Sequence, residues 1–211
     1  DYCREHGITR LYLETETASI ARKNRLAASL NEVEISEDGK FEQIIEELRA
    51  IKSAAELSYI QKAQQMTDET FSYILPLIQP GKSERELMLE MEFYLRRLGS
   101  EGVSFDFIVV SGKNSSLPHG VPTDKKIEKG DFITMDYGAI VNGYRSDMTR
   151  TVAVGFATDE MNQVYNTVLQ AQQKVIETVS AGALCADADN AARINAIVHP
   201  RVKADFHRWL S

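Results

Sequence analysis

The chain has 211 residues, of which 43% are hydrophobic and 26% are charged, which is the balance of an ordinary globular protein. Its net charge of −7 argues against a nucleic-acid surface and against binding to anionic membrane, because both require clustered Lys and Arg. The two cysteines, Cys3 and Cys185, are far apart in sequence, so we expect no disulfide framework and a cytoplasmic location. No apolar run approaches the length of a membrane span.

Residues 1–50 show alternating signals for helices and strands. β-prone residues occupy 8–13, the apolar spacing over 17–30 predicts a short helix, and 32–36 form a possible short strand. We expect these elements to be the end of an α/β unit, because by themselves they make only a thin layer.

The next segment is predicted to be helical. Residues 41–48 and 53–78 carry apolar residues at helical spacing. A turn follows, and Ser83 with Glu86 three residues later forms a capping box that begins a helix ending near Leu98.

A β-hairpin is predicted around Asn142-Gly143. This dipeptide favours a two-residue type I′ turn, because both central residues of that turn need positive φ. The turn then pairs Val141 with Tyr144. An apolar strand is also predicted at 103–110.

Two aspartates share one face of this hairpin. Counting back from the turn places Gly138 opposite Asp147, and alternation puts Asp136 on the same face, about 7–8 Å from Asp147 between backbones. Two carboxylates on one face repel each other, and a divalent cation would compensate them. We expect Gly138 to leave open space above that face. The same spacing also fits a hairpin whose two Asp side chains point into water.

One histidine precedes the hairpin, and two helices follow it. His119 lies in a turn-rich loop, where a lone histidine is usually a surface residue. Residues 158–180 are predicted to form a helix capped by Thr158. Asp187 and Asp189 fall in the first turn of another helix and do not share a face, so we interpret them as first-turn charges and not as ligands.

Three blocks occur in the same order as in a known family. They read Ser-Phe-Asp-Phe-Ile-Val-Val-Ser-Gly over 104–112, Leu-Pro-His-Gly over 117–120, and Gly-Asp-Phe-Ile-Thr-Met-Asp through Ser-Asp-Met-Thr-Arg-Thr over 130–151. The chain thereby resembles the pita-bread metallopeptidases, and most closely their Xaa-Pro dipeptidases (prolidases) and Xaa-Pro aminopeptidases.

The resemblance implies an α+β fold in three parts. Residues 51–193 are expected to form the first half of the pita-bread catalytic domain, and 1–50 the C-terminal part of a creatinase-like N-terminal domain. Residues 194–211 are expected to be a divergent tail.

The resemblance also implies a function and a site. The function is the metal-dependent removal of an N-terminal residue that precedes proline, with Xaa-Pro peptides as substrates. Asp136 and Asp147 would be metal ligands of a centre of two divalent ions (Mn, Co or Zn), with Asp147 bridging the two. His119 would be the catalytic residue that binds the substrate or stabilises the developing oxyanion.

The family's later metal ligands have no counterpart after Arg193, and His199 and His207 lack the glycine context of such ligands. We therefore expect weak or partial metal binding, a chain that is inactive by itself, and a homodimer through an exposed apolar face. The alternatives are a creatinase-like hydrolase without metal, which the presence of both aspartates disfavours, and a non-catalytic binding module.

Overall fold

The computed structural model describes residues 2–15, 17–37 and 39–196, which fall into two compact units that divide between Leu57 and Ser58. The boundaries expected from the sequence, after residues 50 and 193, stay predictions. No helix in these described ranges is long and apolar enough to cross a membrane. Cys3 and Cys185 are free thiols.

The first unit alternates helices and short strands, as the sequence predicts. Its elements are α1 (Tyr2–Glu5), β1 (Arg10–Tyr12), α2 (Ile20–Ser29), β2 (Glu34–Ser36) and α3 (Lys40–Ala50). The two strands pair in parallel, with Leu11 opposite Ile35. None of the described residues of its three helices is buried, as expected of a thin layer.

Two helices begin the second unit. Helix α4 (Ala54–Ile74) passes into a 3-10 turn, η1 (Leu75–Leu77), because Pro76 cannot continue the α-helical hydrogen bonding. Helix α5 (Glu84–Arg97) begins with the predicted capping box: Ser83 Oγ accepts from the Glu86 amide at 3.1 Å, and the Glu86 carboxylate accepts from the Ser83 amide at 2.5 Å.

A three-stranded antiparallel sheet forms the centre of this unit, in the order β3-β4-β7. The remaining elements are β3 (Ile108–Ser111), η2 (Gly112–Ser116), β4 (Phe132–Tyr137), β5 (Ile140–Val141), β6 (Tyr144–Arg145), β7 (Met148–Ala153), α6 (Asp159–Thr178) and α7 (Cys185–Ala196). Strand β3 is shorter than the predicted 103–110, because residue 103 makes only an isolated bridge to Ala139.

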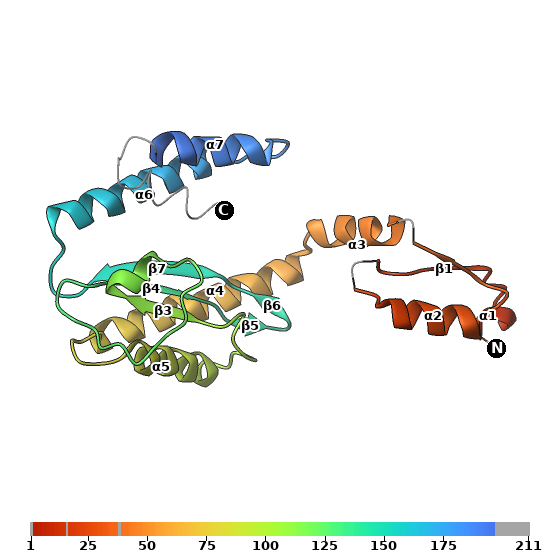
Figure 1. Cartoon of the computed structure of the whole chain (residues 1–211), viewed down its shortest axis with the longest axis horizontal. Coiled ribbons are helices and arrows are strands. Elements are labelled where there is room, and N and C mark those ends of the chain that lie inside the picture. Colours follow the sequence, from red (N-terminus) through yellow and green to blue (C-terminus); the bar gives the residue numbers. More distant parts are fainter. Residues whose placement is uncertain (1, 16, 38, 197–211) are drawn as a thin grey trace. The chain divides into compact units, whose positions relative to one another are not determined.

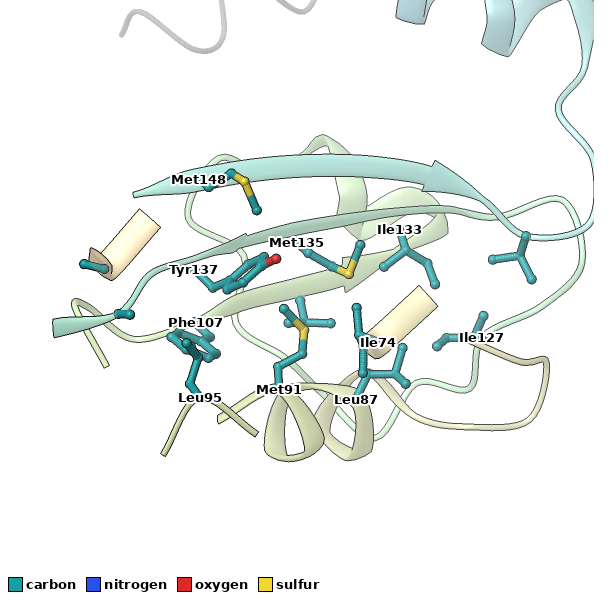
Figure 2. Close-up of a cluster of buried hydrophobic side chains, with 14 of the residues drawn as sticks. Ile74, Leu87, Met91, Leu95, Phe107, Ile127, Ile133, Met135, Tyr137 and Met148 are labelled. Carbon is teal, nitrogen blue, oxygen red and sulfur yellow. The ribbon is translucent and has the colours of Figure 1, made fainter. Parts of the chain in front are cut away.

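The hydrophobic core lies between one face of the sheet and the helices α4 and α5. Figure 2 shows Ile133, Met135 and Tyr137 of β4 facing Leu87 and Met91 of α5, and all five are fully buried. Burial of each large side chain stabilises the fold by about 1.5–3 kcal/mol. In Figure 1, α4 and α5 lie on one side of the sheet, and α6 and α7 lie on the other. The sheet face that points toward α4 and α5 forms the hydrophobic core, and the opposite face does not belong to it.

The predicted hairpin turn is confirmed. Asn142 and Gly143 have φ values of 48° and 78°, and Val141 pairs with Tyr144. The same register continues across the interruption at 138–139 and 146–147, since Tyr137 pairs with Met148.

Candidate metal centre

Asp136 and Asp147 lie on the sheet face away from the core. Asp136 is paired with Thr149 across the β4–β7 ladder, and Thr149 Oγ1 donates to Asp136 Oδ1 at 2.9 Å. Asp147 precedes Thr149 by two residues, so alternation directs it to the same face. Asp136 is half-buried and Asp147 is exposed.

The two carboxylates interact electrostatically. Partial burial and the neighbouring Asp136 carboxylate raise the pKa of Asp147 above its ordinary value. This shift means that the ionised form of Asp147 is disfavoured in the fold as it stands. A divalent cation between them would remove the repulsion, and carboxylate oxygens are donors that such cations accept. The pair therefore fits the metal that the sequence predicts.

Gly138 does not leave open space, so that expectation is wrong. A Cβ at this position would lie 1.9 Å from the carbonyl oxygen of Ser146 and 2.4 Å from Ser104 Oγ. The backbone of the returning strand approaches so closely that only glycine fits. Gly138 thus brings the segment that carries Asp147 against the segment that carries Asp136.

Buried hydrogen bonds fix the residues beside Asp147. The Ser146 amide donates to the carbonyl of Ala139 at 3.0 Å, and Ser146 Oγ accepts from the Ala139 amide at 2.9 Å. Ser146 Oγ also lies 2.7 Å from Thr67 Oγ1 of α4. On the other side, Met148 is buried in the core. Asp147 is therefore exposed between two anchored neighbours.

His119 lies in the loop after η2, and its side chain is exposed. Both η2 and this loop contact the same sheet face as the aspartates: Thr134 Oγ1 donates to the carbonyl of Ser115 in η2 at 3.4 Å, and a Cβ on Gly120 would meet Val110 Cγ1 at 2.8 Å.

The structure brings Asp136 and Asp147 together but does not add His119 to them. Across 2–15, 17–37 and 39–196, no group of three His, Cys, Asp or Glu side chains is placed to hold a metal ion. The roles of the three residues stay predictions. His199 and His207 lie outside the described residues.

The sequence did not predict that Thr149 bonds Asp136 or that Ser146 anchors the chain beside Asp147. Thr149 could have been found, because the turn register pairs it with Asp136. The bond between Ser146 and Thr67 carries no local signal, since 79 residues separate the two.

Comparison with known proteins matches residues 58–200 to the model of metallopeptidase family M24. The chain belongs to metallopeptidase family M24. The resemblance stated from the three sequence blocks is therefore confirmed, and the match extends seven residues beyond the expected end at 193 (200 minus 193).

Among curated relatives, this M24 chain is 38% identical over 193 residues to the uncharacterized peptidase YqhT of Bacillus subtilis, covering 92% of the chain and 54% of the relative. It is 38% identical over 159 residues to the Xaa-Pro dipeptidase of Pyrococcus furiosus, covering 75% of this chain and 46% of the relative.

A solved Xaa-Pro dipeptidase from Bacillus anthracis matches the M24 chain with a TM-score of 0.85 at 39% identity, covering 93% of this chain and 54% of that one. The fold is therefore α+β and corresponds to part of the pita-bread structure. The M24 chain spans about half the length of the relatives it matches.

Proposed function

We propose that this chain is the part of an Xaa-Pro peptidase that carries the first metal ligands. Residues 51–193 would form the first half of the catalytic domain, and 1–50 the end of the domain before it. The coverage of about half of each relative supports this assignment, as does a family match that begins at residue 58.

The proposed reaction is hydrolysis of the peptide bond before proline. The observation that carries it is the pair of carboxylates, Asp136 and Asp147, on one face of the β4–β7 hairpin. In this proposal they hold the divalent cation, Thr149 orients Asp136 through its hydrogen bond, and His119 donates to the substrate. A cation held there supplies Lewis-acid activation of water for peptide hydrolysis.

We propose that the chain by itself holds metal weakly and has no appreciable peptidase activity. Two carboxylates fall short of the three or four protein ligands that zinc sites usually have. A creatinase-like hydrolase without metal is disfavoured, because Asp136 and Asp147 are both present and repel each other without a cation.

Calorimetric titration with Mn²⁺ tests the site. Wild type should bind it saturably, and Asp147→Ala should lower the affinity by about tenfold or more, since it removes one of two charged ligands. Asp124→Ala is the matched control, because Asp124 is an exposed carboxylate that lies 3.5 Å from the guanidinium of Arg85 and belongs to neither strand of the hairpin. Equal binding by all three proteins, or no binding by wild type, would refute the proposed site.

Hydrolysis of an Xaa-Pro dipeptide tests the activity. We expect no turnover by the pure chain with Mn²⁺ present. Chelator-sensitive cleavage, lost in Asp147→Ala, would show that the chain is active without further ligands. Specific capture of a protein partner without metal dependence would favour the binding module instead.

We also propose that the chain forms a homodimer. Helix α6 and the segment after it keep large apolar side chains exposed, although α6 packs against α7 and Tyr165 lies beside Phe132: Tyr165, Val168, Leu169, Ile176, Val179 and Leu184. Exposed apolar patches promote association. Light scattering should give twice the monomer mass, and a monomer across the accessible concentration range would contradict the dimer.

A further inference from the structure

Glu84, the first residue of α5, is a fully buried carboxylate outside the proposed metal centre. Its exposed fraction is 0%, which is unusual for a charged side chain at a helix N-terminus. A buried carboxylate is costly unless several donors satisfy it. Its partners therefore show what this position contributes.

The two carboxylate oxygens of Glu84 bind two different segments. Oε1 accepts from the Ser111 amide at 2.7 Å, from Ser111 Oγ at 2.9 Å and from Asn114 Nδ2 at 3.3 Å. Oε2 accepts from the Thr123 amide at 3.0 Å and from Thr123 Oγ1 at 2.7 Å. Each oxygen therefore accepts at least two hydrogen bonds: Oε1 from residues 111–114 and Oε2 from residue 123.

These two segments are the two ends of the loop that carries His119. Ser111 is the last residue of β3, and Thr123 follows His119 by four positions. Between these ends the segment touches the sheet through the 3.4 Å bond from Thr134 to Ser115 and through Gly120, which packs against Val110. The Glu84 side chain therefore bonds both ends of the loop at its base. The Arg85 amide, which donates to the carbonyl of Thr123 at 3.1 Å, and Lys125 Nζ, which donates to Ser111 Oγ at 3.0 Å, support the same closure.

We propose that Glu84 is a positioning residue that clamps both ends of the His119 loop and thereby sets where His119 lies relative to the sheet face that carries Asp136 and Asp147. The role of His119 in binding substrate rests on the proposed function. The clamp itself does not, so the two can fail separately.

The substitution Glu84→Gln tests the clamp with little change in volume. Glutamine keeps one acceptor oxygen. Its amide nitrogen replaces the second oxygen and therefore faces backbone and hydroxyl donors, to which it cannot bond as an acceptor. It can therefore hold one end of the loop and not both. Glu84→Asp keeps the charge and both oxygens on a shorter side chain, so it should restore part of the effect. Glu86→Gln is the matched control, because Glu86 lies in the same helical turn but bonds Ser83 and Lys126, which lie outside the loop.

Hydrogen exchange reads the loop directly. The amides of Leu117 and Gly120 bond within the loop, whereas those of Met135 and Arg150 belong to paired strands of the sheet. In Glu84→Gln the loop amides should exchange at least about tenfold faster, as expected when charge-assisted hydrogen bonds are lost. The loop amides should accelerate more than the loss of global stability accelerates the sheet amides, and Glu86→Gln should match wild type. Unchanged loop exchange, or equal acceleration of loop and sheet, would overturn the clamp.

The position of His119 is read by paramagnetic broadening with Mn²⁺ alone. Mn²⁺ held at Asp136 and Asp147 should broaden the ring resonances of His119, and the broadening should fall in Asp147→Ala. In Glu84→Gln the broadening of His119 should fall, with Mn²⁺ affinity unchanged and partial recovery in Glu84→Asp. Equal broadening in wild type and Glu84→Gln would refute the positioning role. If wild type binds no Mn²⁺, the proposed function fails and hydrogen exchange still decides the clamp.

Discussion

Ser146 Oγ lies 2.7 Å from Thr67 Oγ1, and this buried contact joins the residue before Asp147 to the middle of helix α4. Thr67 Oγ1 donates its own hydrogen to the carbonyl of Ala63 at 3.0 Å. Ser146 is therefore the donor in the contact, and it accepts from the Ala139 amide at the same time. The two hydroxyls form a chain from the helix backbone to the strand that presents Asp147.

Thr67→Val should destabilise the fold by about 1–3 kcal/mol, because it keeps the side-chain shape but leaves the buried Ser146 hydroxyl without an acceptor. Urea unfolding measures the loss. Ser72→Ala is the control on the same helix, since Ser72 makes the same kind of bond to a backbone carbonyl but is exposed. Equal effects of the two substitutions would show that the Ser146 contact contributes no stability of its own.

Gly138→Ala should destabilise by about 3 kcal/mol or more, because the added methyl would overlap backbone atoms of Ser146 that cannot move without separating the strands. Gly102→Ala is the matched substitution: its Cβ would meet only Ile140 Cδ1, at an ordinary 3.7 Å. Thermal unfolding of both variants measures the difference. A Gly138→Ala protein as stable as Gly102→Ala would mean that the close strand approach is absent in solution.

Asp147→Asn should stabilise the metal-free protein, by no more than about 1 kcal/mol for a charge this exposed. The pKa of Asp147 is raised by burial and by Asp136, so its ionised form at neutral pH opposes folding. Thermal unfolding in chelator measures the gain. Added Mn²⁺ at one hundred times its wild-type dissociation constant should stabilise wild type by about 2.7 kcal/mol, and the variant by about 1.4 kcal/mol or less, since its affinity is expected to fall tenfold or more. A variant less stable than wild type in chelator would contradict the repulsion.

Glu84 should make the free energy of unfolding depend on pH in the acidic range. Burial by itself raises the pKa of this carboxyl, but hydrogen bonds from Thr123 and Ser111 outweigh it and lower the pKa below the ordinary value of about 4.3. Lys125, whose Nζ lies 3.0 Å from Ser111 Oγ, is the nearby cation. A lowered pKa gives stability that is fully present above about pH 4.3 and is lost as pH falls through the folded-state value.

The check is urea unfolding of wild type and Glu84→Gln at several pH values. The difference in unfolding free energy should be constant near neutral pH and should shrink below about pH 4.3. Glu84→Gln is expected to cost about 2–4 kcal/mol at neutral pH, because it removes bonds to a buried charge. A difference that stays constant to the acid limit would show that Glu84 is not ionised in the fold.

The sequence by itself determined the local devices of this protein. Asn142-Gly143 sets the hairpin register because a type I′ turn needs positive φ at both positions, and this register places the two aspartates on one face. The capping box of Ser83 and Glu86 begins α5 through bonds that span three residues. Such signals act between neighbours, so a chain read in order reveals them.

Only the tertiary structure decided the contacts that position these residues. Glu84 reads as an ordinary first-turn charge, yet its donors lie 27 to 39 residues further along the chain. Gly138 was expected to leave room, and it instead admits the backbone of Ser146. Periodicity and turn chemistry report which side of an element faces the core. They do not report which distant group meets it there, because that depends on how helices and strands pack around one shared interior.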